Sequence, residues 1–364
     1  MTFSFRRAWL LIPSLLVAFA AAAEMAARLD DLMRYDVPVF AAPLAGYDLI
    51  VRDSATIRGR PYGRFEKIQL NAAGFRGPPI TPVPAAGCIR VMVLGSSESI
   101  VGGEEAGTEY PARMQQALDR RGCFEVQNAA VSGLNIGRIT LLWNDWAARW
   151  SPNVVVIYPS PAFYLLPEGP DYPTRALPQV RPPAWWTPRI AARLSGQSFW
   201  PDFLAKRSLR RYIARKVAGQ RRGWEYRAVP GSRLALYQGH LDSLVVAVEA
   251  SGAEAVLVTH ANRFPDPPAG EDELLLLGWA RDSRARPRVI LDFEHAANAA
   301  MVAVARRRDA MLVDAAGRMS GRREWFTDFS HFTREGRAVL GDLVADSVAA
   351  LVARRAADGD GTSP

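Results

Sequence analysis

The chain has few cysteines and few histidines. Its 364 residues include two cysteines and four histidines, and none of them has the short, repeated ligand spacing of a zinc site. The pair Asp328 and His331 is by itself a weak metal signal. The sequence therefore predicts no metal site, and we expect no cofactor.

Lysine is also scarce, although the chain is basic. Lys and Arg number 45 against 37 Asp and Glu, and the only lysines are Lys67, Lys206 and Lys216. The positive charge is spread along the chain and interleaved with acidic residues, whereas nucleic-acid-binding proteins gather it on one face or element. We therefore expect no nucleic-acid partner.

Long uncharged runs are few, and one of them lies near the N-terminus. Residues 8–23 carry no charge and follow two arginines, which fits a signal sequence or a slightly short membrane-spanning helix. An apolar helical pattern continues through residues 25–33, so we expect an uncleaved anchor over residues 1–33. Cleavage after the small residues 20–23 and a buried core helix are the alternatives. The arginines before the run predict that the rest of the chain is extracytoplasmic.

After the anchor, the composition separates a lead-in from a larger domain. Residues 34–86 are rich in proline, glycine and turn signals. Over residues 87–354, short β-branched runs alternate with amphipathic stretches, as in a parallel sheet wrapped by helices. The expected strands are 89–94, 124–127, 154–158, 255–259 and 310–313, and the expected helices are 110–121, 139–150, 234–250, 289–307 and 334–354. The sequence thus predicts an α/β domain, a three-layer α/β/α sandwich with a five-stranded parallel sheet, and a disordered tail over residues 355–364.

One connection is far longer than usual. Residues 160–232 leave the carboxyl edge of the sheet, where open α/β folds bind ligands, so we expect a cap insertion over the site. Its Trp185 and Trp186 are candidate substrate-binding residues, and an ordinary hydrophobic cluster is the equal alternative. Residues 203–217 predict a basic amphipathic helix, for which a solvated face, anionic lipid or an acidic polysaccharide remains open.

The two cysteines occupy equivalent places. Cys88 and Cys123 each stand one residue before an expected strand, and consecutive strands of such sheets are often neighbours. An exported protein permits a disulfide between them. Two buried free thiols are the alternative.

Hydroxyl groups gather where the first expected strand of the sheet ends. Gly95, Ser96, Ser97 and Ser99 form a tight turn at the carboxyl edge, where a serine Oγ is exposed and its backbone N–H can face a developing oxyanion. Serine-rich turns are also common helix caps. Taken alone, the turn is therefore a weak signal of catalysis.

A carboxylate and an imidazole stand three residues apart before the last expected helix. Asp328 can accept a hydrogen bond from one ring nitrogen of His331 and leave the other nitrogen free as a base. His240 and His295 fall inside helical patterns and are expected to be core or surface residues. His260 ends an expected strand at the same edge and is a candidate lining residue.

Together these blocks resemble the SGNH/GDSL hydrolase superfamily over roughly residues 72 to 352. Gly95-Ser96-Ser97 resembles the family's first block, and Asp328 and His331 resemble its last. The segment from Asn128 to Gly133 resembles the second block, and residues 71–77 resemble the lead-in of membrane-anchored members. The resemblance implies a flavodoxin-like SGNH hydrolase fold with Ser97, His331 and Asp328 as the catalytic triad. It also implies an oxyanion hole formed by the N–H groups of Ser97 and Gly133.

The third block departs from the family pattern. Ser160 stands where the family has Gly, and Ala162 stands where the family has the Asn that donates to the oxyanion. Loss of one such donor typically costs on the order of 10²–10³ in rate. Ser160 and Asn135 are the candidate substitutes, and the pair at 144–145 is expected to be helical and unrelated to the site.

The resemblance implies a serine esterase acting on O-acyl, above all O-acetyl, groups of envelope carbohydrate or lipid. An O-acyltransferase that uses the same residues is one alternative. A catalytically degenerate binding or assembly protein of the cell envelope is the other, because one oxyanion donor is missing.

Overall fold

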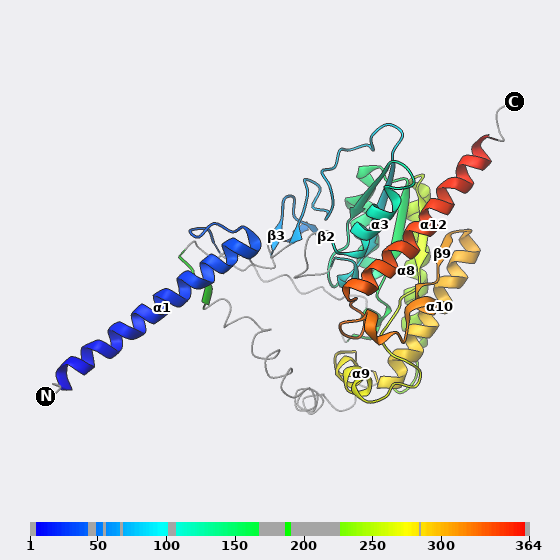
Figure 1. The fold of residues 1–364 in the computed structure, drawn as a ribbon. Helices are drawn as coiled ribbons and strands as arrows, with labels where there is room; N and C mark the ends of the chain where they lie inside the picture. The colour runs from blue at the N-terminus through cyan, green and yellow to red at the C-terminus, as the bar shows by residue number, and fades with distance from the viewer. Residues whose placement is uncertain are drawn as a thin grey trace. The chain divides into compact units, whose positions relative to one another are not determined.

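The computed structural model describes residues 5–42, 49–53, 56–65, 68–100, 107–166, 186–190, 226–283 and 285–360 (Figure 1). The chain divides into two compact units. Residues 1–45 and 179–212 form the first, and residues 46–178 and 213–364 form the second, here called the main unit. The predicted basic helix at 203–217, Trp185 and residues 361–364 of the predicted tail lie outside the described residues.

The first unit contains the long N-terminal helix α1, Phe5–Tyr35. Its stretch Ile12–Tyr35 has a mean hydropathy of 1.5 and is largely exposed, with Leu15, Val17 and Phe19 each more than 60% exposed. That length and composition satisfy the requirement for crossing a membrane, and a signal sequence near an N-terminus satisfies the same requirement. The helix continues without a break past the candidate cleavage residues.

The last turns of α1 are charged and paired within the first unit. Arg28 contacts Glu24 at 2.7 Å, and the buried guanidinium of Arg189 contacts Asp31. Glu24 also accepts hydrogen bonds from the backbone N–H groups of Arg189 and Ile190. The predicted cap insertion 160–232 is therefore divided, because part of it folds with the N-terminal helix.

The main unit is built on a five-stranded parallel sheet. Its strands are β5 (Ile89–Gly95), β6 (Phe124–Asn128), β7 (Val154–Tyr158), β8 (Glu254–Val258) and β9 (Met311–Val313). Their order is β6-β5-β7-β8-β9, so the strand order reverses beside β5. This is the flavodoxin-like order, in which ligands bind at the carboxyl ends of the strands near the reversal. The predicted fold class is confirmed.

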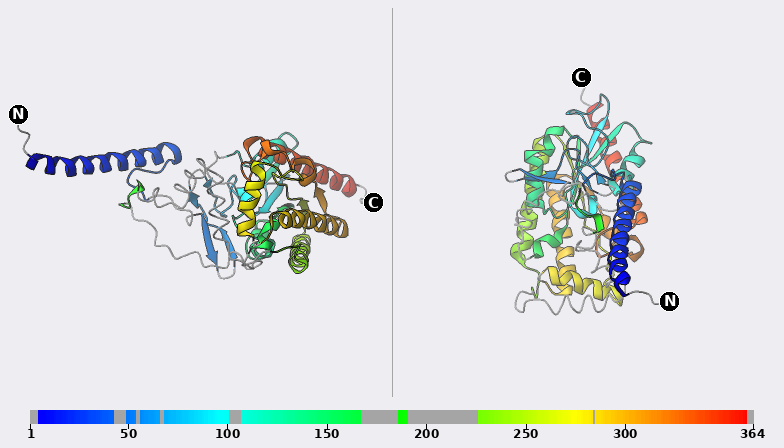
Figure 2. Two further views of the ribbon diagram at one scale, coloured as in Figure 1. Left: turned by 90° about the horizontal axis from the view of Figure 1, so that it is seen from below. Right: turned by 90° about the vertical axis from the view of Figure 1, so that its left-hand side faces the viewer.

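Helices cover both faces of this sheet. Val91 and Val93 of β5 pack in the core with α3 (Tyr110–Leu118) and α12 (Arg334–Asp360). Met92 and Leu94 point to the opposite face, because side chains alternate along a strand. That face is covered by α4 (Ile136–Asp145), α8 (Gly231–Ala250) and α10 (Pro287–Arg308). Figure 2 shows α12 in red and α8 in green on opposite sides of the sheet.

Several elements were not predicted from the sequence. The lead-in contains two antiparallel hairpins, β1 (Ile50–Asp53) with β2 (Thr56–Gly59) and β3 (Arg64–Phe65) with β4 (Ile68–Gln69). Two helices follow β8 and β9, namely α9 (Glu271–Asp282) and α11 (Ala315–Met319). Three short helices were also not predicted, α2 (Ser97–Ile100), η3 (Pro161–Leu165) and η5 (Arg323–Trp325). The predicted helix 139–150 ends in the structure as a separate short helix, η2 (Ala147–Trp150).

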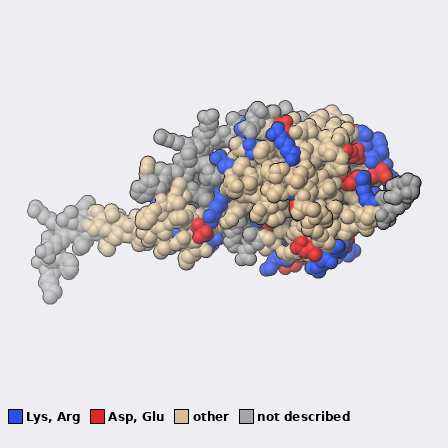
Figure 3. Space-filling view, turned by 90° about the horizontal axis from the view of Figure 1, so that it is seen from above, with Lys and Arg blue, Asp and Glu red and all other residues tan. Residues whose placement is uncertain are grey.

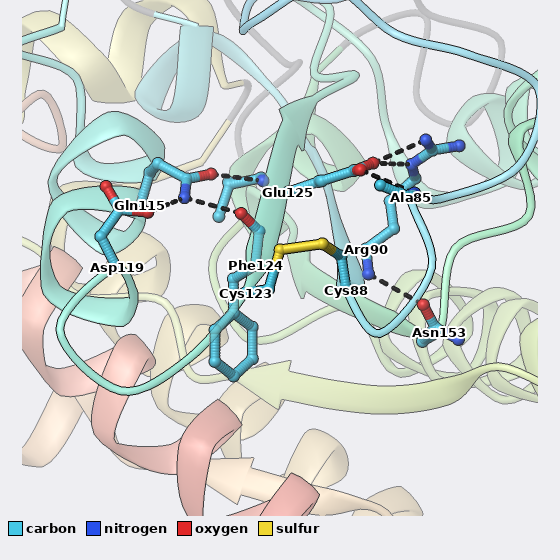
Figure 4. Close-up of a disulfide and its surroundings, with 10 residues drawn as sticks. Ala85, Cys88, Arg90, Gln115, Asp119, Cys123, Phe124, Glu125 and Asn153 are labelled. Carbon is cyan, nitrogen blue, oxygen red and sulfur yellow. Dashed lines mark hydrogen bonds and ion pairs between the residues drawn. A yellow bond between two sulfur atoms is a disulfide. The ribbon is translucent and has the colours of Figure 1, made fainter.

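Cys88 and Cys123 form a disulfide at the starts of the neighbouring strands β5 and β6, with their Cα atoms 4.5 Å apart (Figure 4). A buried ion pair lies beside it, with Arg90 Nη2 2.6 Å from Glu125 Oε2. The side chain of Asn153 accepts a hydrogen bond from the backbone N–H of Arg90 at 2.8 Å. The disulfide and this pair both join β5 to β6 at the edge of the sheet opposite the serine turn.

Charges of both signs lie side by side on the surface of the main unit. Figure 3 shows Lys and Arg next to Asp and Glu on one face. Several arginines are paired, for example Arg307 and Arg308 with Asp242, and Arg288 with Asp266 and Asp292. In these places the basic residues that contribute to the net charge of +8 are paired with acidic neighbours and do not form a purely positive patch.

Removal of the disulfide should lower stability. The Cys88→Ser/Cys123→Ser double variant opens a loop of 35 residues, so we expect its free energy of unfolding in urea to fall by about 4 kcal/mol in the chain-entropy model. Alkylation of the unreduced, denatured wild-type protein should find no free thiol. Two alkylated cysteines in that sample would show that the bond is absent.

Candidate active site

Ser97 stands at the start of α2, directly after the carboxyl end of β5, and its side chain is half-buried. Gly95 makes the turn possible, because a Cβ at that position would collide with Ser99 Oγ and the carbonyl oxygen of Tyr158. The carbonyl of Ser96 accepts hydrogen bonds from the N–H groups of Ser99 and Ile100. The turn therefore holds Ser97 at the edge of the sheet where ligands bind.

Arg76 of the lead-in holds the serine turn in place. Arg76 pairs through its backbone with Asn128 at the end of β6. Its guanidinium donates to the carbonyl of Ile100 at 2.7 Å and forms a buried ion pair with Glu109 at 3.0 Å. Asn128 Nδ2 donates to the carbonyl of Ser99 at 2.8 Å. Arg76 of the lead-in and Asn128 of β6 thus hold the C-terminal end of the serine turn, a role that the sequence did not reveal.

Asp328 and His331 form a hydrogen-bonded pair. Asp328 Oδ2 lies 2.8 Å from His331 Nδ1, and Asp328 Oδ1 accepts from the N–H groups of Ser330 and His331. The turn is closed by the N–H of Thr327, which donates to the carbonyl of His331 at 2.8 Å. Burial by itself lowers the pKa of His331, but the bond to Asp328 and the nearby carboxylates outweigh it and raise that pKa above its usual value.

No hydrogen bond joins Ser97 to His331 among the described residues. Ser97 Oγ instead donates to Glu98 Oε2 at 3.3 Å. Ser330 Oγ, from the residue before His331, donates to the other oxygen of the same carboxylate at 3.2 Å. Glu98 therefore links the serine turn to the histidine turn.

Glu98 belongs to a buried chain of ionisable groups that sequence reasoning missed. Glu98, His260 and Glu294 are each 2% exposed or less. His260 Nδ1 lies 2.6 Å from Glu294 Oε2, and His260 Nε2 lies 3.5 Å from Glu98 Oε1. The ring of Tyr158 stacks on His260, with centroids 5.5 Å apart. His260, expected as a lining residue, is completely buried and supports the site from inside.

The two carboxylates keep His260 protonated. Burial by itself lowers the pKa of His260, but Glu294 and Glu98 outweigh it and raise that pKa to about 10. Burial by itself raises the pKa of Glu98, but the contact with His260 and the charges of His260 and His331 lower it to about 2. Near neutral pH Glu98 is therefore a carboxylate and His260 an imidazolium.

The predicted oxyanion donors are only partly available. The N–H of Gly133 donates to Ser96 Oγ at 3.0 Å, so a substrate oxygen reaches it only when Ser96 turns away. Ala162 and Ser160 are buried beside the end of β7. Asn135 Oδ1 caps α4 by accepting from the N–H of Arg138 at 3.1 Å. The N–H of Ser97 is at the first position of α2, where no intrahelical acceptor exists.

The other candidate residues lie elsewhere. Asp145 is the last residue of α4, as expected, and contacts Thr56. His240, in α8, contacts the hydroxyl of Tyr164 at 2.8 Å, and His295 is exposed on α10. Trp186 belongs to the first unit and is 67% exposed.

An aromatic stack near His331 was also missed. Trp279 of α9 stacks on Phe329 with ring centroids 4.6 Å apart, and the ring of Phe264 also stacks with Trp279, with centroids 6.1 Å apart. The ring of Phe329 lies 6.3 Å from that of His331. Phe264 and Trp279 are buried, whereas Phe329 is half-buried. The stack therefore gives the histidine side of the site an apolar wall.

Within the described ranges, no group of three or more His, Cys, Asp or Glu side chains is arranged to hold a metal ion.

No protein-family model matches the chain. A search of curated proteins likewise finds no relative.

Solved structures that resemble the chain include GDSL-type lipolytic proteins, acylhydrolases and esterases. TesA is 15% identical with a TM-score of 0.41 over 71% of this chain and 97% of its own. A lipase/acylhydrolase from Enterococcus faecalis is 12% identical, with a TM-score of 0.43 over 72% and 96%. A mutant of Axe2, an acetyl-xylooligosaccharide esterase from Geobacillus, is 13% identical with a TM-score of 0.41 over 74% and 96%. At this level of likeness, the function has to be argued from the residues.

Replacement of Arg76 should destabilise the main unit. Arg76→Ala leaves Glu109 buried without its ion pair, which typically costs about 3–5 kcal/mol. The matched control is Arg121→Ala, since Arg121 pairs with Asp346 at the surface and such a pair contributes about 1 kcal/mol or less. Urea unfolding measures both, and equal effects of the two substitutions would contradict the role given to Arg76.

Proposed function

We propose that this chain is a serine esterase that removes O-acyl groups through an acyl-enzyme on Ser97. The observation that supports it most is the hydrogen-bonded pair of Asp328 and His331 on the same site as the serine turn, with Glu98 bonded to both Ser97 and Ser330. The family resemblance of these blocks points to the same residues.

The reaction follows from the chemistry of these groups. The proton of Ser97 passes to Nε2 of His331, while Oγ forms a bond to the acyl carbon and the carbonyl electron pair moves onto oxygen. Asp328 orients the imidazole and stabilises its charged form. His331 then gives the proton to the leaving alkoxide, and water repeats the sequence on the acyl-enzyme. The N–H groups of Ser97 and Gly133 are the proposed oxyanion donors.

The compartment restricts the substrate. We infer that α1 is an uncleaved anchor and that the main unit is extracytoplasmic, where a disulfide such as Cys88–Cys123 persists. The proposed substrate in that compartment is an acyl ester, above all an acetyl ester, on envelope carbohydrate or lipid. Transfer of the acyl group to a sugar hydroxyl instead of water makes the same site an O-acyltransferase.

A binding or assembly protein is the second candidate. It is favoured by Ala162 in place of the oxyanion Asn and by the bond that occupies the N–H of Gly133. The two classes differ in whether Ser97 reacts with an electrophile.

A fluorophosphonate probe should therefore label the wild-type protein and leave the Ser97→Ala variant unlabelled. Ser243→Ala, the same change on an exposed position of α8, should label like wild type.

His331→Asn should reduce the labelling rate by at least about 10²-fold, because the general base is lost. In wild type the rate should rise with pH through the raised pKa of His331, since only the neutral ring accepts the proton. Absence of labelling between pH 6 and 9 would favour the binding protein.

Phe329 should affect binding of the acyl or sugar group more than the chemical step. Phe329→Ala removes the half-buried ring beside His331, so we expect KM for p-nitrophenyl esters to rise about 10-fold with little change in kcat, in line with the loss of a large apolar contact. Steady-state kinetics with acetate and butyrate esters measure this. A loss confined to kcat would place Phe329 in the catalytic machinery instead.

A further inference from the structure

The residue after the proposed nucleophile is a buried carboxylate with contacts on both sides of the site. Oε2 of Glu98 accepts from Ser97 Oγ at 3.3 Å, and Oε1 accepts from Ser330 Oγ at 3.2 Å. Ser330 and His331 belong to one short turn whose N–H groups both bind Asp328. A single side chain therefore joins two segments that are 232 residues apart in the sequence.

The position of Glu98 is set from inside the domain. His260 follows β8 and lies 3.5 Å from Glu98 through Nε2, while Glu294 of α10 holds the other ring nitrogen at 2.6 Å. Asn298, also on α10, fixes the backbone of His260 through two hydrogen bonds. The end of β8 and helix α10 thus fix the histidine that contacts Glu98.

We propose that Glu98 is a positioning residue, which aligns the Ser97 turn with the His331 turn and stabilises the His331 imidazolium that forms when Ser97 loses its proton. This inference rests on the proposed esterase function. Glu98 does not itself take the proton, because a carboxylate with a pKa of about 2 is too weak a base near neutral pH.

The charge balance supports this role. Glu98 is a carboxylate near neutral pH, and Asp328 is bonded to the imidazole of His331. A proton that arrives at His331 is therefore attracted by both side chains. Asp328 and Glu98 raise the pKa of His331, whereas His260 lowers it. Because the pKa of Glu98 is lowered and that of His260 is raised, we expect the titration of His331 to set the acidic limb.

The test measures the second-order rate of fluorophosphonate labelling of Ser97 against pH in the full-length protein. Glu98→Gln keeps the size of the side chain and removes its charge. We expect the maximal rate to fall about 10-fold or more, and the midpoint of the acidic limb to move down by about 0.5–1 pH unit, since an opposite charge is lost near His331. A lower rate with an unchanged midpoint would overturn the electrostatic role.

Glu294→Gln is the matched control in the same buried chain. No hydrogen bond or ion pair joins Glu294 to Ser97 or Ser330 among the described residues. The positive charge of His260 lowers the pKa of His331, and loss of Glu294 makes His260 easier to deprotonate. The midpoint should therefore stay or move up. A downward shift equal to that of Glu98→Gln would show a general effect of disturbing the core and would contradict the proposal.

Ser330→Ala tests alignment and keeps every charge, so it remains informative if Glu98→Gln fails to fold. It removes the bond to Glu98 Oε1, and we expect a rate at least about 5-fold lower with the wild-type midpoint. A wild-type rate would overturn the alignment role. Failure of the wild-type protein to label would instead overturn the esterase proposal, so the two ideas fail separately.

Discussion

Two buried carboxylates that share one imidazolium determine how this site is held. Glu294 fixes His260, and His260 faces Glu98, which accepts bonds from both Ser97 and Ser330. Charges with such low exposure are tolerated only when they are paired and hydrogen-bonded. The network therefore holds α2, the end of β8 and α10 in one arrangement. Because Glu98 is bonded to Ser97 and Ser330, the serine and histidine turns are held in fixed positions as well.

The sheet supplies the frame for this network. Parallel strands place the ends of β5, β7 and β8 at one edge, and the reversal of strand order beside β5 leaves room there. At the opposite edge, the disulfide and the pair of Arg90 with Glu125 join β5 to β6. Arg76 extends this frame to the lead-in, since it contacts both the serine turn and Glu109.

The sheet and its major helices could be predicted from the sequence because their signals are local. Runs such as 154–158 are β-branched and fully buried, and the spacing of Asp328 and His331 suits one short turn. The network could not be predicted, because Glu98 and Glu294 are separated from His260 by 162 and 34 residues. Acidic residues are also common in the first turn of a helix, where they interact favourably with the helix dipole. Nothing in the sequence therefore assigned Glu98 any other role. Helix α9 was missed because its leucines stand in one continuous run instead of a helical period.

The central claim is that Ser97 attacks an acyl carbon whose oxygen is received by backbone N–H groups. It is tested most directly by a crystal structure of the protein after reaction with a small alkyl fluorophosphonate. The account predicts phosphorus bonded to Ser97 Oγ, the phosphoryl oxygen within about 3 Å of the N–H groups of Ser97 and Gly133, and the Ser96 hydroxyl turned away from Gly133. A phosphoryl oxygen directed away from both N–H groups, or an adduct on another residue, would contradict it.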